Sequence, residues 1–279
     1  MRKHTIKPVE RQIQVNALVS VLDALRPKGF YFPGESHDFW EGVFVYEGEV
    51  TATADERVYQ LGPGKLLLHK PMEFHRIWAA KDCAPRLINI SFQAKGQIMQ
   101  RLENSCFELN EEQQQQFWKV AEVFAQAVRI KETQDVEAYQ VAATLTAAML
   151  EVFLIRLSEH TEYTQRAQSA NEERYSKIVQ VMQANCHKNL SLAELAELCQ
   201  MSISNMKRIF GLYSDVGIAK YFLAMKMRRA MELMDRGMHA SRVAEELQYP
   251  EPSYFYTVFK RETGMTPAQY RNRHKKQSK

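Results

Sequence analysis

Two segments near the C-terminal end of the chain repeat one pattern, and this repeat restricts the possible folds more than any other feature. Residues 195–222 and residues 243–271 both open on a short Ala-Glu stretch that ends in Leu, and both place Gln where a turn would begin. In each copy a second apolar-periodic stretch ends in Phe, and a Tyr follows 11 residues later, at Tyr221 and Tyr270. Such a unit is typical of a helix–turn–helix with a following helix. The repeat therefore predicts an all-α domain with two helix–turn–helix units.

The basic residues of the chain gather in the region of this repeat. Residues 174–279 contain 18 Lys/Arg and 9 Asp/Glu, a net charge of +9, whereas residues 1–173 contain 19 and 24, a net charge of −5. A basic module beside a mildly acidic one indicates a nucleic-acid partner for the basic module. Because a helix–turn–helix lays its second helix in the major groove of DNA, we predict this role for residues 202–213 and 252–261.

The last hundred residues or so resemble the DNA-binding domain of the AraC/XylS family of bacterial transcription regulators. The likeness is carried by SYF and VFKRETGMTPAQYR, in residues 253–271. The family usually has Gly at the turn of each unit, where this chain has Gln200 and Gln248, so we expect different or strained turns. The resemblance implies a DNA-reading face that consists of Ser204, Asn205, Lys207 and Arg208 in the first unit and Ser253, Tyr256, Thr257, Lys260 and Arg261 in the second.

The first third of the chain has the pattern of short strands. Apolar or alternating stretches such as GVFVYEGEV, KLLLHK and RLINISFQ are separated by turn residues, as in LGPGK. Many short strands with turns between them are typical of a sandwich or a small barrel.

Two of these stretches contain His and Glu at a regular spacing. His37, Glu41 and Gly48 fall at H-x3-E-x6-G, and a later stretch places His75 at the end of P-x3-H. These spacings resemble the two half-motifs of cupins, small β-barrels that bring His and Glu together inside. A full metal-binding cupin motif has a His where this chain has Glu35, so the match is partial.

Three interpretations of these residues stay open. AraC-type regulators commonly place a cupin-like barrel before the DNA-binding domain, so the resemblance implies a sensory pocket for a sugar or another small molecule. Two His and one or two carboxylates would also suit a divalent transition metal. Alternatively, His37 and Glu41 satisfy each other's hydrogen bonds and have a structural role, and the role of His69 is open. The predicted ligand-binding residues are His37, Glu41, His75, Glu35, Trp40, Tyr46 and Trp78, and no metal ligand is assigned.

Helical spacing of apolar residues between about 110 and 160 predicts two long helices, which either pair with a second subunit or pack on their own barrel. The chain is thus expected to be an α+β multidomain protein. Its predicted parts are a cupin-like β-barrel that senses a ligand (1–109), a helical dimerisation segment (110–163), a linker (164–173), and an all-α DNA-binding domain (174–279) with helix–turn–helix units at about 191–213 and 240–261.

The sequence favours a cytoplasmic transcription regulator over an enzyme. It shows no nucleophile triad, phosphate loop or complete metal set, and no apolar run that approaches a membrane span. The expected partners are promoter DNA, a small-molecule effector and a second copy of the chain. The resemblance implies an activator, for which RNA polymerase would be a further partner. No cofactor and no membrane are expected. The alternatives are a metal-binding cupin enzyme or metal sensor fused to a DNA-binding domain, and a ligand-independent regulator.

Overall fold

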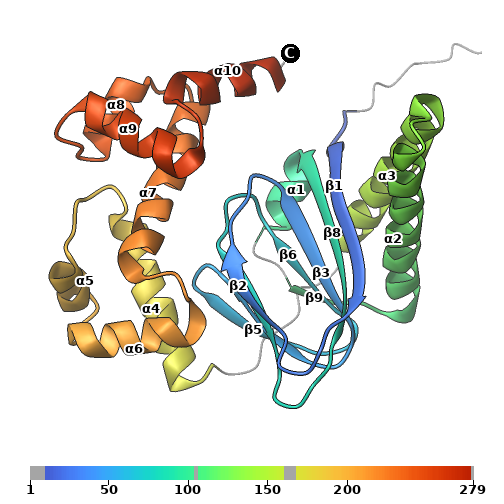
Figure 1. Ribbon diagram of the computed structural model, residues 1–279, viewed down its shortest axis with the longest axis horizontal. Coiled ribbons are helices and arrows are strands. Elements are labelled where there is room, and N and C mark those ends of the chain that lie inside the picture. Colours follow the sequence, from blue (N-terminus) through green and yellow to red (C-terminus); the bar gives the residue numbers. More distant parts are fainter. Residues whose placement is uncertain (1–9, 104–105, 160–167, 278–279) are drawn as a thin grey trace, which may run out of the picture. The chain divides into compact units, whose positions relative to one another are not determined.

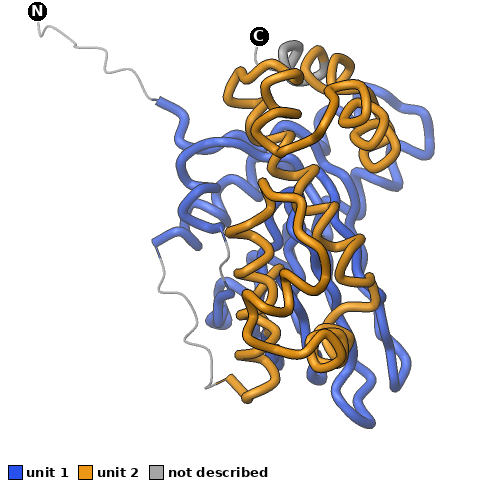
Figure 2. Tube along the Cα trace, turned by 90° about the vertical axis from the view of Figure 1, so that its left-hand side faces the viewer, with its two compact units in different colours: residues 1–54, 59–166 blue, residues 55–58, 167–279 orange. Residues whose placement is uncertain are grey.

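The computed structural model describes residues 10–103, 106–159 and 168–277. The chain divides into two compact units (Figure 2). Unit 1 consists of residues 1–54 and 59–166, and unit 2 consists of residues 55–58 and 167–279. Each unit has its own core, and the two are described separately below.

Unit 1 is built on two antiparallel sheets (Figure 1). The larger one has the strand order β1-β8-β3-β6-β9 and the smaller one the order β2-β7-β4-β5. The predicted β-rich domain is therefore present, as two sheets that face each other. The strands are β1 (Gln14–Leu25), β2 (Tyr31–Glu35), β3 (Trp40–Glu47), β4 (Val50–Ala54), β5 (Arg57–Leu61), β6 (Lys65–His69), β7 (His75–Ala79), β8 (Arg86–Lys95) and β9 (Cys106–Glu108).

Alternation along the strands divides the apolar side chains of unit 1 into two core clusters. On β3, Val43 and Val45 belong to a cluster that draws on both sheets, whereas Trp40 and Phe44 belong to a cluster that also includes the helices of the unit. Successive side chains of a strand point to opposite faces, so one strand serves both clusters. The central strand β3 is consequently buried on both faces along most of its length.

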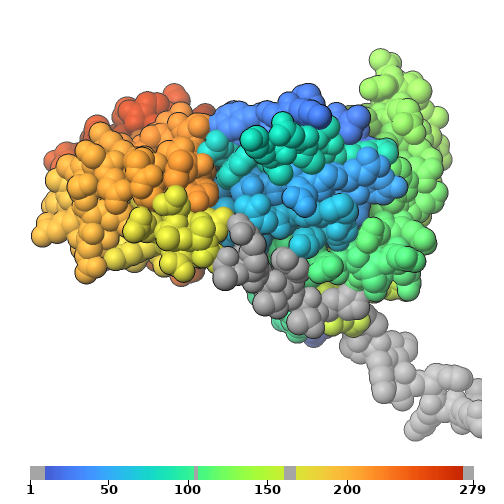
Figure 3. Space-filling view, turned by 90° about the horizontal axis from the view of Figure 1, so that it is seen from below, coloured from blue at the N-terminus to red at the C-terminus, as the bar shows by residue number. Residues whose placement is uncertain are grey.

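Three helices of unit 1 cover the outer face of the five-stranded sheet, and the surface of α2 lies directly against that of the strands (Figures 1 and 3). They are α1 (Gln97–Arg101), α2 (Glu111–Glu132) and α3 (Val136–Leu157). The side chain of Asn110 accepts a hydrogen bond from the backbone N–H of Gln113 at the start of α2, and Asp135 caps α3 in the same way. The two long helices predicted between residues 110 and 160 are thus confirmed.

Helix α3 is more apolar than a surface helix usually is. By length and composition alone it could cross a membrane, although one such helix is weak evidence for a membrane span. Only 22% of its apolar window is buried inside the unit. The expectation that no apolar run approaches a span does not hold for the composition of this helix, whose charged residues are Glu137, Glu151 and Arg156.

Unit 2 is helical, as the repeat predicts (Figure 1). Its helices are α4 (Ala170–Asn185), α5 (Leu192–Leu198), α6 (Ile203–Tyr213), α7 (Ile218–Asp235), α8 (Ala240–Glu246), α9 (Pro252–Thr263) and α10 (Pro267–Gln277). The side chain of Ser169 caps α4, so the last residues of the predicted linker 164–173 are helical. The part of that linker before residue 168 lies outside the described residues.

A buried ion pair lies in the core of unit 2. Asp55, 3% exposed, accepts hydrogen bonds from Arg228 Nη1 at 2.6 Å and Nη2 at 3.2 Å. Tyr175 Oη donates to the carbonyl oxygen of Asp55 at 3.0 Å, and Tyr221 Oη lies 3.4 Å from its carboxylate. Burying a charged group is costly unless it is paired and hydrogen-bonded, and these contacts supply the partners. They also connect residues 55–58 to α4 and α7.

Candidate functional site

Helix α6 places the predicted DNA-reading residues of the first repeat on its exposed side. Met206, Ile209 and Phe210 are buried and hold the helix against the core of unit 2. Ser204, Lys207 and Arg208 are exposed, and the half-buried Asn205 accepts a hydrogen bond from Arg208 Nη2 at 3.1 Å. The buried residues recur every three or four positions, so they lie on one face of the helix. The opposite, outward face of α6 therefore presents the polar and basic residues.

Helix α9 has the same construction in the second repeat. Phe255, Val258 and Phe259 form its buried side. The Thr257 hydroxyl donates to the carbonyl oxygen of Ser253 at 3.1 Å, and Arg261 pairs with its neighbour Glu262 at 2.7 Å. All five predicted residues of this helix are exposed, namely Ser253, Tyr256, Thr257, Lys260 and Arg261.

The turns before the two reading helices are equivalent and unusual. Gln200 has φ 58° and Gln248 has φ 56°, which is the left-handed region that favours glycine. Each Gln thus adopts the conformation in which glycine is favoured, which is the condition for the strain expected at these positions. The backbone geometry of a helix–turn–helix is kept in both repeats, although neither turn has glycine.

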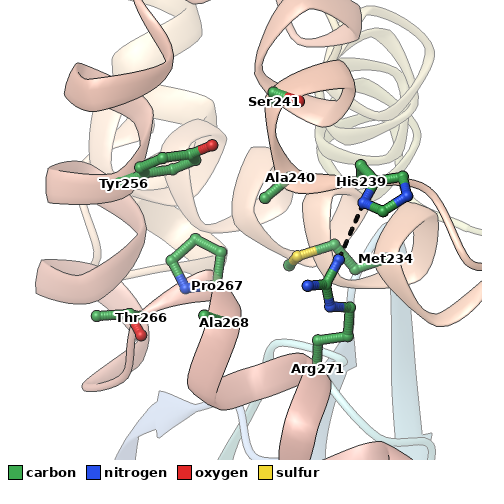
Figure 4. Close-up of a pocket in the computed structure, with 9 residues that line it drawn as sticks. All are labelled: Met234, His239, Ala240, Ser241, Tyr256, Thr266, Pro267, Ala268 and Arg271. Carbon is green, nitrogen blue, oxygen red and sulfur yellow. Dashed lines mark hydrogen bonds between the residues drawn. The ribbon is translucent and has the colours of Figure 1, made fainter.

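A cavity of about 320 Å³ lies beside the second reading helix (Figure 4). Tyr256 lines one side, and His239 and Arg271 line the other, where Arg271 Nη1 lies 3.1 Å from His239 Nδ1. Tyr256 is the one predicted DNA-reading residue that borders this cavity. The other lining residues come from the end of α7, the start of α8 and the start of α10.

A second group of polar residues lies between the two sheets of unit 1. Because side chains alternate along a strand, Glu41 lies on the same face of β3 as Val43, which belongs to the core cluster shared by the sheets. His69 lies with Leu67 on β6 in the same way. The same reasoning places His75, Asn89 and Ser91 on this inner face.

Strand pairing brings these residues together at one end of the inner face. Glu41 is paired with His69 on one neighbouring strand and with Ser91 on the other. In the smaller sheet, Glu35 is paired with His75. Ligand atoms of Glu35, His37, Glu41 and His75 all lie within 4.8 Å of one another. The structure therefore unites the two predicted half-motifs.

The two predicted histidines of this cluster are oriented by backbone carbonyl groups. His37 Nδ1 lies 3.0 Å from the carbonyl oxygen of Phe39, whose ring stacks on the imidazole at 3.7 Å. His75 Nδ1 lies 3.1 Å from the carbonyl oxygen of Glu73. A carbonyl oxygen can only accept, so both Nδ1 atoms carry the proton and both Nε2 atoms present a lone pair in the neutral ring.

Glu41 is held by its own set of donors. Asn89 Nδ2 donates to Oε1 at 2.9 Å, and Ser91 Oγ donates to Oε2 at 3.2 Å. Burial raises the pKa of Glu41, but the contact with His37 and the nearby His75 outweigh this effect and lower it to about 2. Burial and the nearby His69 lower the pKa of His75 to about 4. Near neutral pH the cluster thus contains a carboxylate and a neutral imidazole.

His69, whose role the sequence left open, points into the same region. Its ring stacks on that of His75 with centroids 4.3 Å apart, and its Nδ1 lies 2.9 Å from Glu73 Oε2. Both members of this pair are almost fully buried. Sequence reasoning missed His69, Glu73, Asn89 and Ser91 as parts of the site; for His69 the period-two alternation with Leu67 was an available signal.

The aromatic residues predicted to line a sensory pocket lie elsewhere. Trp40 is buried in the core cluster on the other face of β3. Tyr46 is 42% exposed and packs against Trp118. Trp78 lies under the guanidinium group of Arg76. The structure thus groups His37, Glu41, His75 and Glu35, and it does not bring the three aromatic rings to them.

Comparison with known proteins identifies a known domain in each half of the chain. The AraC-like ligand binding domain family matches residues 19–150, and a helix-turn-helix domain family matches residues 195–273. The HTH-type transcriptional activator RhaR of Yersinia pestis bv. Antiqua (strain Angola) is 23% identical over 251 residues, which cover 87% of this chain and 85% of that protein. The protein of the same name from Enterobacter sp. (strain 638) is 23% identical over 265 residues, with 88% and 89% covered.

Among solved structures, ToxT from Vibrio cholerae O395 is 13% identical, with a TM-score of 0.37 over 94% of this chain and 98% of that chain. The two domain families and the full-length relatives agree with the order of domains along the chain.

Proposed function

Because the chain belongs to the AraC family of DNA-binding transcription regulators, we propose that it is a cytoplasmic activator that responds to a small molecule bound in unit 1. Activation is inferred from the full-length relatives, which are named transcriptional activators. An activator of this kind would contact RNA polymerase at the promoter. No catalytic role is proposed, since the relatives are regulators.

One observation carries the DNA-binding part of this proposal. The two reading helices bury equivalent apolar sides and expose equivalent polar sides, each after a left-handed turn. A pair of such helices reads successive major grooves when they lie about 34 Å apart. Arg208 and Lys207 can reach guanine edges or phosphates, and Lys260 and Arg261 can hold phosphates.

DNA binding is tested by selecting duplexes from a random-sequence pool and measuring affinity by fluorescence anisotropy. We expect Arg208→Ala to weaken binding to the selected duplex by about 1–3 kcal/mol and to relax the preference at one base pair. Arg129→Ala on α2 removes the same charge from an exposed site of unit 1 and is the matched control. Equal affinity of wild type and Arg208→Ala would remove this residue from the interface.

The effector is proposed to be a sugar or a sugar derivative. Carboxylates accept and neutral imidazoles donate or accept hydrogen bonds, so Glu35, Glu41 and the histidines between the sheets are suited to hydroxyl groups. A thermal-shift panel of sugars and sugar acids tests this, because a ligand at 100 times its dissociation constant adds about 2.7 kcal/mol. Glu41→Ala is expected to abolish the response and leave DNA affinity intact. A response that survives this change places the effector elsewhere, and no response at all favours a ligand-independent regulator.

We further propose that a second copy of the chain covers α3. Val141, Leu145, Val152 and Ile155 are between 38% and 66% exposed. Together with Ala148 they recur at alternating spacings of four and three residues, which is the seam of a helix pair. The predicted α2 part of the interface is less suited to this role, since Val123, Phe124 and Ala127 are buried within unit 1.

Sedimentation of the purified chain tests the dimer. We expect Leu145→Glu to shift the chain from dimer to monomer, because it places a charge in the middle of the apolar seam. Val136→Glu is the matched control, since Val136 is 69% exposed on the same helix but lies off the seam. A monomeric wild type, or a dimeric Leu145→Glu variant, would contradict this interface.

A further inference from the structure

We propose that unit 1 binds a divalent transition-metal ion through His37, His75 and Glu41, with Glu35 as a further oxygen ligand. The sequence left a divalent metal as one open interpretation of these residues and assigned no metal ligand. The inference depends on the geometry of unit 1 and not on the proposed sugar response.

The first reason is the pair of imidazole nitrogens that the fold leaves without partners. The Nε2 atoms of His37 and His75 are buried and have no hydrogen-bond partner. His75 is only 3% exposed, and both histidines belong to the cluster of possible metal-binding residues. A buried polar atom without a partner costs about 1–3 kcal/mol, so two of them in one place require an explanation.

The distances argue against a closed hydrogen-bonded pair. His37 Nε2 lies 3.6 Å from Glu41 Oε2 and 3.9 Å from Glu35 Oε1, both too long for a hydrogen bond. Two ligands bound to one ion at about 2.1 Å lie roughly 3.4 Å apart in a tetrahedral arrangement, which is close to the 3.6 Å found here. The neighbouring pair of His69 and Glu73 shows the contrast, since it is closed at 2.9 Å.

The surroundings of the ligand atoms are those of a metal site. Histidine ligands usually donate their other ring N–H to a carbonyl oxygen or carboxylate, which fixes the tautomer and the ring orientation. The carbonyl groups of Phe39 and Glu73 have this role for His37 and His75. Glu41 is likewise held by Asn89 and Ser91, so each of the three proposed ligands has a partner that fixes its orientation.

The donor set indicates the class of ion. Two imidazole nitrogens with one or two carboxylate oxygens suit zinc, iron(II), manganese(II) and related divalent ions, whereas calcium and magnesium prefer oxygen ligands alone. With all four protein ligands bound, an ion that takes five or six ligands keeps a coordination position open. An oxygen atom of the effector could occupy that position, so a metal and a sugar or sugar acid are compatible at this site.

The test is equilibrium dialysis of the untagged, chelator-stripped full chain against Zn²⁺, Mn²⁺ and Co²⁺, with metal content measured by emission spectroscopy. We expect one ion per chain and a higher melting temperature when metal is added without any sugar. His75→Gln and Glu41→Gln are expected to lose the ion, whereas His187→Gln in unit 2 keeps it. Asn89→Ala, which removes only a group that orients Glu41, is expected to weaken binding about 10–100-fold.

Two results would overturn the proposal. One is a folded wild type that binds none of the three ions. The other is an ion that His75→Gln and Glu41→Gln retain with wild-type affinity, which would place it on other groups such as the cysteines. Because Asn89→Ala leaves all proposed ligands in place, its metal affinity still tests the site if a ligand variant fails to fold. A sugar response in the presence of chelator would support the proposed function without supporting the metal.

Discussion

Replacing the two glutamines of the helix–turn–helix turns by glycine is expected to stabilise unit 2. Gln200 and Gln248 have φ of 58° and 56°, where a residue with a Cβ atom costs about 1–2 kcal/mol relative to glycine. Glycine also raises the conformational entropy of the unfolded chain, which lowers the free energy of unfolding by about 0.4–1 kcal/mol. We therefore expect a gain of about 0.5–1 kcal/mol at each turn, and an additive gain in the double variant.

The assay is urea denaturation of the full chain followed by circular dichroism, with Gln200→Ala and Gln248→Ala as matched controls. The alanine variants remove the same side chain, including the contact of Gln200 Oε1 with Lys177 Nζ at 3.3 Å, but they keep the Cβ atom in the left-handed region. Each glycine variant should unfold at a higher urea concentration than its alanine counterpart, with an unchanged slope. If glycine and alanine gave equal stability at both turns, the argument from backbone strain would be refuted.

Three further substitutions test the cores of the two units. Asp55→Asn leaves Arg228 buried without its counter-ion and should lower the free energy of unfolding by about 3–5 kcal/mol in urea denaturation. A loss below about 1 kcal/mol would show that the ion pair is solvated. Burial lowers the pKa of Lys226 from 10.5 to about 8. Between these two values the unfolded state binds more protons than the folded state, so the free energy of unfolding rises with pH. Lys226→Met should remove that rise from denaturation curves measured between pH 7 and 11. Gly96→Ala places a Cβ atom against the carbonyl oxygen of Gln12 at φ 124° and should lower the melting temperature of the chain, while Gly62→Ala, where the added atom meets nothing, should not.

Much of unit 2 could be predicted from the sequence because its signals are local. The reading helices α6 and α9 begin within one residue of the predicted positions, since Ser202 caps α6 and Pro252 is the first residue of α9. Different or strained turns were expected at Gln200 and Gln248, because the family that the chain resembles usually has Gly there, and both residues have positive φ. The face of each helix that is exposed follows from the same spacing.

The polar site of unit 1 could be predicted only in part. His37, Glu41 and His75 were selected by spacing, and the structure brings them together with Glu35. The aromatic residues were selected as faces for ring stacking, yet Trp40 adjoins Glu41 and points to the opposite face. The side chains of adjacent strand residues lie on opposite faces of the sheet, so proximity along the chain is a poor guide to a site between sheets.

The sequence by itself determined the order of the domains, the helical repeat and the outward faces of the reading helices, because these depend on residues within one or two turns of each other. Only the tertiary structure decided which polar groups meet between the sheets, that the Nε2 atoms of His37 and His75 find no partner, and that Asp55 pairs with Arg228 from a position 173 residues away. Strand order and register bring distant residues together, and neither is determined by local preferences.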